Sequence, residues 1–200
     1  MSSSLWAPRK LAAAEESLAK FAQDIHPSSS VVPVQLDITD DASIKTAIAC
    51  VTQHLQEKAL AGLNVLVNNA GIVGSTFQET YAVNVFGTVA FTEAIRPLLK
   101  DGGAILNISS GLGSLYVHTQ RPPPPVLLSY SSSKSALNSL TLQWAIQEEQ
   151  KGSGIRVVSI DPGYNATNLN NYRGTMDPKD GCKVIVSAAL EEGGKSGVFF

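Results

Sequence analysis

Tyr130 and Lys134, in the run Tyr130-Ser131-Ser132-Ser133-Lys134, are the two side chains whose types and spacing point most directly to chemistry. The run opens a predicted helix over 129–150, and residues four apart on a helix lie on the same face. A phenol with an ordinary pKa of about 10 is a weak acid–base group at neutral pH, and a neighbouring ammonium favours its ionised form. The pair therefore indicates acid–base catalysis, although tyrosine and lysine also occur at this spacing on solvated helix faces.

Polar turns follow two predicted strands of the chain. The strand 63–67 runs into Asn68-Asn69-Ala70-Gly71, and the strand 104–108 runs into Ser109-Ser110-Gly111. In open α/β sheets, ligands bind beyond the carboxyl ends of the strands, and small residues let a ligand approach the backbone. Each turn alone could be an ordinary loop. Together with the tyrosine and lysine, they predict a binding site at one edge of a sheet.

The elements that must position these residues alternate between helix and strand. Apolar periodicity predicts helices over 10–21, 40–62, 79–99, 129–150 and 177–190, and strands over 31–38, 63–67, 104–108 and 155–160, with no element before residue 10. This alternation implies parallel strands joined by right-handed crossovers. The predicted fold class is α/β, a doubly wound parallel sheet.

Composition favours one soluble domain with a small-molecule ligand. The 200 residues are 44% hydrophobic and 16% charged, and a formal net charge of -2 offers no basic surface to nucleic acid or to an anionic membrane. We find no apolar stretch long enough to span a bilayer and no secretory signal. Cys50 and Cys182 have no partners at metal-ligand spacing, so we expect no metal and a reducing, cytoplasmic location.

The order of these motifs resembles the classical short-chain dehydrogenase/reductase family. The matching residues are Asn68-Asn69-Ala70-Gly71, Asn84, Ile108-Ser109-Ser110, Tyr130 with Lys134, Asp161-Pro162-Gly163 and Thr167. The resemblance covers nearly the whole chain and implies a Rossmann-type fold. It also implies an NAD(P)-dependent oxidoreductase, with NADP the slightly preferred cofactor, that acts on a ketone, an aldehyde or a secondary alcohol.

The resemblance also implies roles for individual residues. Tyr130 is the expected general acid or base, Ser110 hydrogen-bonds the reacting oxygen, Lys134 contacts the nicotinamide ribose and lowers the pKa of Tyr130, and Asn84 holds a water that relays protons. Asp37 is expected to meet the adenine. The other implied cofactor contacts, besides Tyr130 and Lys134 themselves, are Asn69, Ala70, Gly71, Pro162, Gly163 and Thr167.

A proline-rich segment separates Ser110 from Tyr130 by more than the classical pattern does. The run Arg121 to Pro125 cannot form a helix or a central strand, because proline lacks an N–H and fixes φ. We predict an inserted loop over 112–128, with docking of the prolines on another protein as the alternative. In this family, the loop and the segment 164–180 would line the substrate pocket, where aromatic and aliphatic residues favour an apolar compound, unless they only pack the loops.

The expected phosphate-binding turn is the main departure from the family. No G-x-x-x-G-x-G precedes Asp37, so we expect a partial Rossmann-type domain over 1–200 that lacks the first two strands and the glycine-rich turn. Such a shortened chain would bind dinucleotides weakly. The strand at 31–36 would then either pair directly with the strand at 63–67 or have no neighbouring strand. Arg9 resembles a phosphate-binding arginine, but its distance from the following helix does not match well.

Two other functions stay open at this point. A truncated, inactive family member could act as a binding or regulatory subunit, and an isomerase or epimerase on the same scaffold would retain Tyr130 and Lys134. We also hypothesise a homo-oligomer formed through the helices 79–99 and 129–150. Apolar residues that could form this surface are Phe86, Phe91, Leu137, Leu140 and Trp144.

Overall fold

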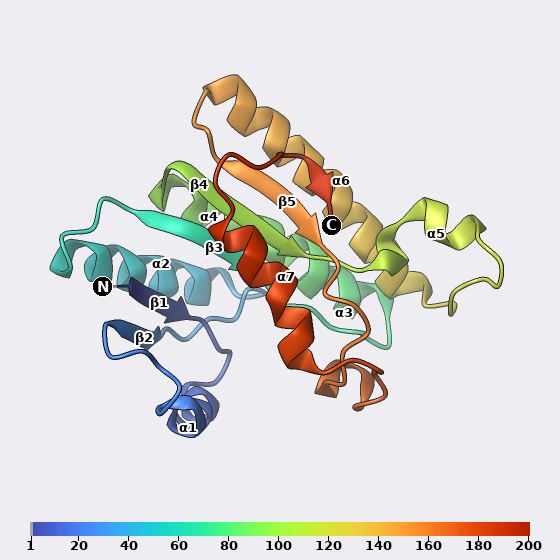
Figure 1. Cartoon of the computed structure of the whole chain (residues 1–200), viewed down its shortest axis with the longest axis horizontal. Coiled ribbons are helices and arrows are strands. Elements are labelled where there is room, and N and C mark those ends of the chain that lie inside the picture. The colour runs from blue at the N-terminus through green and yellow to red at the C-terminus, as the bar shows by residue number, and fades with distance from the viewer. Residues whose placement is uncertain (1) are drawn as a thin grey trace.

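A four-stranded parallel sheet forms the centre of the computed structural model, which describes residues 2–200. Its strand order is β3-β4-β5-β6, and Figure 1 shows the strands side by side with helices around them. The apolar runs found in the sequence form the first three strands, and the tail of the chain forms the fourth. The bounds are β3 Leu63–Asn68, β4 Leu99–Ile108, β5 Arg156–Ile160 and β6 Val198–Phe199.

A second sheet of two strands lies at the N-terminal side. The strand β1 (Ser2–Trp6) pairs in parallel with β2 (Ser29–Pro33), and α1 (Leu11–Phe21) connects them. Two expectations are thereby corrected: a strand does precede the first helix, and β2 neither floats nor pairs with β3. The run SSSLW is too short and too polar to show a periodicity, so it becomes a strand only through pairing with β2.

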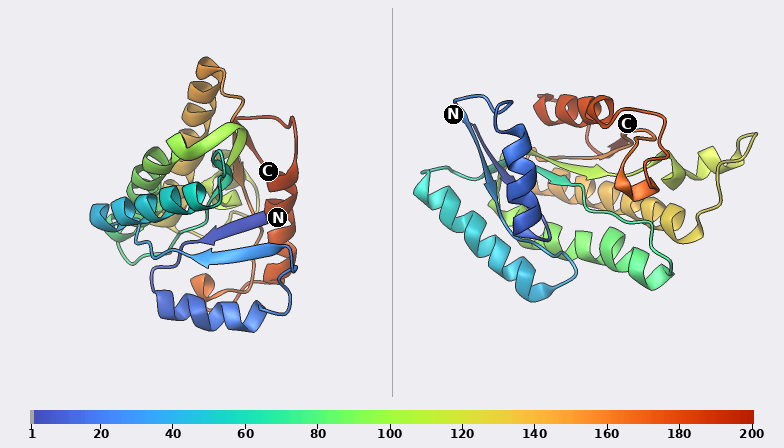
Figure 2. Two further views of the ribbon diagram at one scale, coloured as in Figure 1. Left: turned by 90° about the vertical axis from the view of Figure 1, so that its left-hand side faces the viewer. Right: turned by 90° about the horizontal axis from the view of Figure 1, so that it is seen from below.

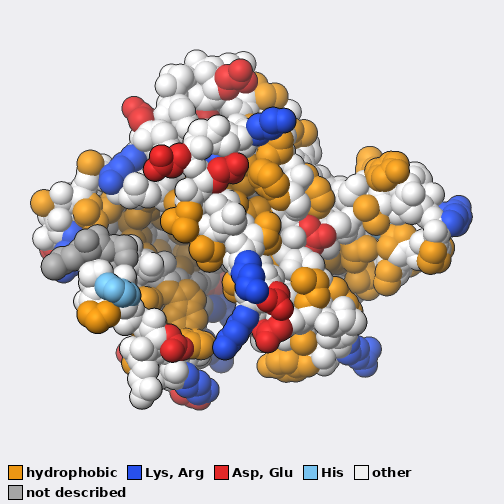
Figure 3. Space-filling model, in the orientation of Figure 1, with side chains coloured by type: hydrophobic (Ala, Val, Ile, Leu, Met, Phe, Trp, Pro, Cys, Tyr) orange, Lys and Arg blue, Asp and Glu red, His pale blue; other side chains and the backbone are white. Residues whose placement is uncertain are grey.

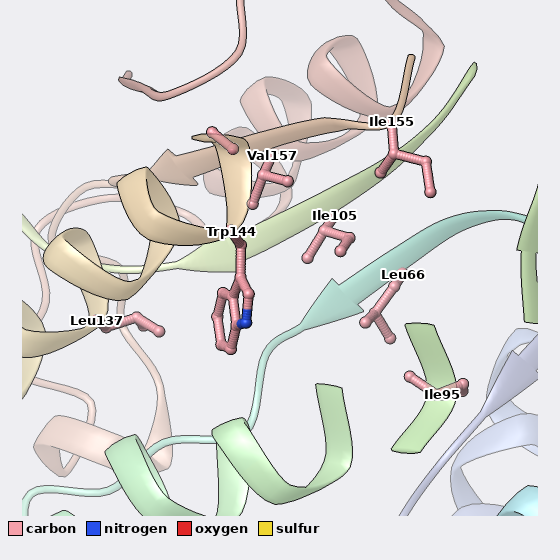
Figure 4. Packing of buried hydrophobic residues seen from close by; sticks show 8 residues of the cluster. Leu66, Ile95, Ile105, Leu137, Trp144, Ile155 and Val157 are labelled. Atoms are coloured by element: carbon pink, nitrogen blue, oxygen red, sulfur yellow. The ribbon is translucent and has the colours of Figure 1, made fainter. Parts of the chain in front are cut away.

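Helices cover both faces of the four-stranded sheet, as a doubly wound fold requires (Figure 2). On one face, α4 (Thr88–Ile95) and α6 (Leu128–Lys151) enclose a cluster built around Ile105, Leu137 and Trp144 (Figure 4). On the other face, α7 (Pro178–Leu190) packs on Leu106, Val158 and Ile160 through Ala188. The strand residues of both clusters are almost completely buried, which explains why the strands read as continuous apolar runs.

The predicted helix over 79–99 is divided into several pieces. A capping box between Thr76 and Glu79 starts α3 (Phe77–Tyr81), a π-helical segment follows over Ala82–Gly87, and α4 leads into a 3-10 turn at Arg96–Leu98. β4 then begins at Leu99, earlier than the glycines at 102 and 103 suggested. Single turns of π-helix occur often at functional sites, and this one contains Asn84.

The remaining segments follow the sequence predictions closely. Asp40 caps α2 (Asp41–Glu57), which ends before the predicted boundary at 62. The proline run is a loop, as predicted, and it follows the short helix α5 (Leu115–Thr119) on an arm that projects from the body (Figure 1). Apolar side chains gather on this arm (Figure 3), where Leu115, Tyr116, Val126 and Leu128 are exposed.

Candidate active site

Tyr130 and Lys134 lie in the first turns of α6, and both are buried. Their exposed fractions are 8% and 4%, and the Lys134 Nζ lies 5.7 Å from the centre of the Tyr130 ring. Lys134 Nζ donates a hydrogen bond of 2.7 Å to the Ile108 carbonyl at the end of β4. The alternative of a solvated helix face is therefore excluded for this pair.

Ser110 lies in the turn directly after β4 and is joined to Tyr130 by a hydrogen bond between their side chains. Its Oγ also accepts from the Leu112 N–H at 3.2 Å, which caps the 3-10 turn at Gly111–Gly113. Burial raises the pKa of Tyr130, the bond to Ser110 lowers it, and the charge of Asp161 raises it further. The three groups thus share one small region at the carboxyl ends of β4 and β5.

Burial also acts on Lys134, and lowers the pKa of its ammonium to about 8. Desolvation disfavours the charged form of a lysine and the charged form of a tyrosine alike. In this structure the causes that act on Tyr130 are burial, Ser110 and Asp161. The lowering of the Tyr130 pKa by Lys134 stays a prediction.

Asn84 holds the π-helical segment against two neighbouring elements. Its side chain accepts from the Ile72 N–H at 2.8 Å, donates to the Ile72 carbonyl at 2.9 Å, and donates to Ser133 Oγ at 3.0 Å. Ser133 in turn donates to the Tyr130 carbonyl at 2.7 Å. Asn84 therefore joins the turn after β3 to the helix that carries Tyr130 and Lys134.

A cavity of about 1700 Å³ lies between the two sheets and brings four of the predicted cofactor residues together. Asp37, Asn69, Ala70 and Gly71 line it, and so does Arg9. Hydrogen bonds from Thr39 hold the pKa of Asp37 below its ordinary value, and the charge of Arg9 contributes in the same direction. The volume exceeds that of a usual small-molecule pocket, about 300–1,000 Å³, because the two sheets do not pair with each other.

The segment after β5 carries the last predicted contacts. Gly163 has a φ of +82°, a conformation that favours glycine, and its N–H donates to Asp161 Oδ1 at 3.0 Å. Pro162 accepts from Asn165 Nδ2 at 2.8 Å, and Thr167 precedes the 3-10 turn at Asn168–Asn170. These residues follow the end of the strand beside β4, but they do not line the large cavity.

Buried polar side chains fix the strands beneath this site. Asn68 Nδ2 donates to Thr92 Oγ1 at 2.9 Å and to Asn107 Oδ1 at 2.8 Å. Asn107 Nδ2 donates to Thr141 Oγ1 at 2.8 Å, and Thr141 Oγ1 is 2.8 Å from Ser159 Oγ. The chain of hydrogen bonds crosses β3, β4 and β5 from α4 to α6. A fully satisfied buried network favours one arrangement of its members. We therefore expect these hydrogen bonds to fix the positions of β3, β4 and β5 relative to one another.

The nicotinamide end of a dinucleotide fits the residues present. A Cβ placed on Gly71 would lie 3.3 Å from Lys134 Nζ, which is a tight contact, and 3.6 Å from Asn84 Oδ1, which is an ordinary one. An ammonium, a phenol and a serine hydroxyl are suitable partners for a ribose and a reacting oxygen. Tyr130 and Lys134 would hold the ribose, and Asp37, which lines the large cavity together with Arg9, would meet the adenine.

Asp161 and Arg9 are the residues whose importance the sequence reasoning missed or set aside. Asp161 was recognised only as part of a motif, yet its carboxylate bridges two turns of the site. Arg9 was set aside because of its distance from the helix, yet it lines the same cavity as Asp37. An arginine soon after a strand was the available signal, but the strand itself had not been recognised.

Two further findings concern membranes and metals. None of the helices within residues 2–200 combines the length and the apolar character needed to cross a bilayer. Over the same residues, histidine, cysteine and carboxylate side chains do not gather in groups of three or more that could hold a metal ion.

Known proteins match this chain over most of its length. The family model for short chain dehydrogenases matches residues 7–178. Short-chain dehydrogenase anuI of Penicillium roqueforti is 34% identical in an alignment of 182 residues that covers 82% of this chain and 69% of that protein. Estradiol 17-beta-dehydrogenase 2 of Mus musculus is 33% identical in an alignment of 163 residues that covers 76% of this chain but only 40% of that protein.

A solved structure agrees with these sequence matches. The NADPH-bound carbonyl reductase from chicken fatty liver superimposes with a TM-score of 0.74 at 30% identity, and the match covers 100% of this chain and 83% of that one. The parallel sheet and its flanking helices are thus shared over the whole length of this chain.

Proposed function

This chain belongs to the short-chain dehydrogenase family, and on that premise we propose that it transfers a hydride between a nicotinamide dinucleotide and a ketone, an aldehyde or a secondary alcohol. The observation that carries the proposal is the buried group of Ser110, Tyr130 and Lys134, with Gly71 against the lysine. Buried acid–base groups of this kind are frequent at catalytic sites. Because the chain spans less than half the length of the mouse relative, the activity of the whole protein is part of the proposal.

The mechanism assigns one task to each side chain. The dinucleotide supplies or accepts the hydride when bound. In reduction, Tyr130 gives its phenolic proton to the carbonyl oxygen, and the hydroxyl of Ser110 donates a hydrogen bond to the same oxygen. Lys134 is protonated below a pH of about 8, binds the ribose, and favours the phenolate that forms. Asn84 positions α6, the helix that carries Tyr130 and Lys134, through its hydrogen bond to Ser133.

NADP is the cofactor that we propose over NAD. Arg9 lines the cavity together with Asp37 and lowers the pKa of its carboxyl, so it places a positive charge at the adenine side. Guanidinium groups pair well with phosphate oxygens. The solved carbonyl reductase that resembles this chain carries NADPH, which supports the same choice.

An apolar carbonyl compound is the substrate class that we propose. The arm 115–128 presents exposed Tyr116 and Leu128, and the segment after β5 presents exposed Tyr164 and Tyr172. The first segment follows β4 and Ser110 in the chain, and the second follows β5 and Asp161. One relative of this chain is an estradiol dehydrogenase, and a relative of known structure is a carbonyl reductase. The first of these agrees with a bulky apolar substrate.

The test is a direct assay of the full-length protein with NADPH and with NADH. We expect oxidation of NADPH on addition of apolar ketones and aldehydes, with the alcohol as product. Conversion of a substrate without net change of the dinucleotide would favour the isomerase alternative. Absence of turnover with a broad panel, together with tight association with an intact relative, would favour the regulatory subunit and contradict the proposal.

Self-association is the second part of the proposal, with a surface that differs from the sequence expectation. Leu137 and Trp144 are buried against the sheet and do not contribute to it. Phe86 is 65% exposed beside Tyr81 and Phe77, and α6 exposes Leu142 and Ile146. Exposed apolar faces of this kind are often covered by a second copy. Light scattering that gives only the monomer mass over a wide concentration range would contradict this part.

A cytoplasmic location is the third part. Cys50 and Cys182 are both free and exposed, which agrees with a reducing compartment, where thiols persist. Fractionation of cells that express the tagged protein tests this location. Recovery of the protein in the secreted fraction would contradict it.

A further inference from the structure

Asp161 connects two turns of the candidate site through its two carboxylate oxygens. It follows β5 directly, and its own N–H donates to the Phe200 carbonyl at 2.7 Å. Its Oδ2 accepts from the Gly111 N–H at 2.8 Å, and its Oδ1 accepts from the Gly163 N–H at 3.0 Å. The turn after β4 and the turn after β5 are thus held by one side chain.

Both turns require glycine where the carboxylate touches them. A Cβ on Gly111 would lie 2.8 Å from Asp161 Oδ2, closer than a real Cβ contact. Gly163 adopts a φ of +82°, which other residues rarely tolerate. Since Ser110 immediately precedes Gly111, the bond from Gly111 to Asp161 also fixes the backbone that carries the Ser110 hydroxyl.

The charge of Asp161 acts on the neighbouring phenol. Two charged groups act around Tyr130 within the described residues: Lys134 on the same helix and Asp161 at the end of β5. From α3 and the π-helical segment, the neutral side chains of Thr80 and Asn84 contact the same helix as Tyr130, at Ser129 and Ser133. An adjacent carboxylate disfavours the phenolate, and Asp161 raises the pKa of Tyr130 in this way.

We propose that Asp161 is a positioning residue of this site, which locks the Ser110 turn against the turn at Pro162-Gly163 and holds a carboxylate charge near the phenol of Tyr130. The proposal rests on the proposed function, in which Tyr130 gives a proton to the substrate oxygen. The charge of Asp161 acts on the pKa of Tyr130 in the same direction as burial, which is the larger cause.

The charge is tested by titration of tyrosine ultraviolet absorbance, which needs neither turnover nor cofactor. The chain contains five tyrosines, so the signal of Tyr130 is obtained as the difference between the parent and Tyr130→Phe. The same difference is then measured in an Asp161→Asn background, where we expect Tyr130 to ionise at lower pH. An unchanged or higher midpoint overturns the proposal. Asp161→Ser, which also removes the charge, replaces Asp161→Asn if that variant does not fold.

The lock is tested by amide hydrogen exchange at Gly111 and Gly163. An asparagine offers one acceptor oxygen where aspartate offers two, so at least one of these amides should exchange about tenfold faster or more, as expected for loss of a bond to a charged group. The matched control Asp101→Asn removes an exposed carboxylate and should leave both amides and the Tyr130 titration unchanged. Unaltered exchange in Asp161→Asn overturns the lock.

These two measurements separate the inference from the proposed function. If the titration and the exchange change as expected while the full-length parent shows no turnover, the role of Asp161 stands and the oxidoreductase proposal fails. If the parent is active, the pH profile of alcohol oxidation should move to lower pH in Asp161→Asn. A profile that stays in place would overturn the positioning role in an active enzyme.

Discussion

At the scale of single residues, the hydroxyl of Tyr130 is the group on which the proposed chemistry depends. Tyr130→Phe keeps the ring in its buried place next to Lys134 and removes only the proton donor. We expect the rate of carbonyl reduction to fall by about two to four orders of magnitude, the usual contribution of a general acid. Steady-state kinetics of the full-length protein measure this. Tyr81→Phe, which removes a phenolic hydroxyl on α3, is the control, and a Tyr130→Phe rate within about threefold of the parent would exclude Tyr130 as the acid.

Lys134 is expected to act through charge on both the phenol and the ribose. Burial already raises the pKa of Tyr130, and the Lys134 ammonium lies 5.7 Å from the ring centre, so its removal takes away a charge that favours the phenolate. Lys134→Met should therefore move the pH optimum of alcohol oxidation upward and weaken dinucleotide binding. A pH–rate profile and a binding titration test the two effects, with Lys45→Met as an exposed control. An unaltered profile would contradict the coupling of Lys134 to Tyr130.

At the scale of elements, the π-helical segment is held in place by one side chain. Asn84 makes three hydrogen bonds, two partly buried ones to Ile72 and a buried one to Ser133. Asn84→Ala leaves the Ile72 N–H and carbonyl without their partner, and each buried polar group left unpaired costs about 1–3 kcal/mol. We expect the free energy of unfolding to fall by at least about 2 kcal/mol. Urea unfolding monitored by fluorescence measures it.

A matched substitution makes this stability prediction specific. Gln56→Ala changes an exposed amide on α2, and its effect should stay within about 0.5 kcal/mol, as is usual for surface positions. An Asn84→Ala loss no larger than that of Gln56→Ala would show that the three bonds do not hold the segment. In that case the π-helical geometry would need another cause, such as packing of Val85.

At the scale of the whole molecule, the two sheets are separate hydrogen-bonded units. β1 and β2 pair only with each other, whereas β4 and β5 lie inside the four-stranded sheet. Leu5 and Val34 connect the small sheet to the rest through side-chain packing around Ile44 and Phe91. Regions with fewer buried contacts open at lower free energy. We expect amides of β1 and β2 to exchange well before those of β4 and β5.

Native-state hydrogen exchange followed by mass spectrometry or NMR resolves these units. Leu106 and Val158, which are completely buried, should show the highest protection in the chain. Val31 and Leu5 should show protection that is lower by several-fold or more, with unfolding of the small sheet as a separate step. Equal protection in both sheets would mean that the cavity between them does not divide the cooperative unit.

Much of the four-stranded sheet was determined by the sequence alone. The buried runs around Ile105 and Val157 are apolar on both faces, and only a sheet covered by helices on both sides satisfies such a pattern. The helical spacing of Tyr130 and Lys134 likewise placed them on one face of α6. Local patterns of this kind depend on neighbours in the chain, and a sequence displays them directly.

Only the tertiary structure decided how distant segments meet. The run Ser2–Trp6 has no periodicity of its own and becomes a strand because β2 offers it hydrogen-bond partners. Arg9 gained importance only when it was found beside Asp37, and Asp161 only when its oxygens were found on Gly111 and Gly163. The π-helical segment that divides the predicted 79–99 helix is where Asn84 bonds to Ile72 and Ser133. Such contacts join residues that are far apart in the sequence, so their effect appears only after the chain has folded.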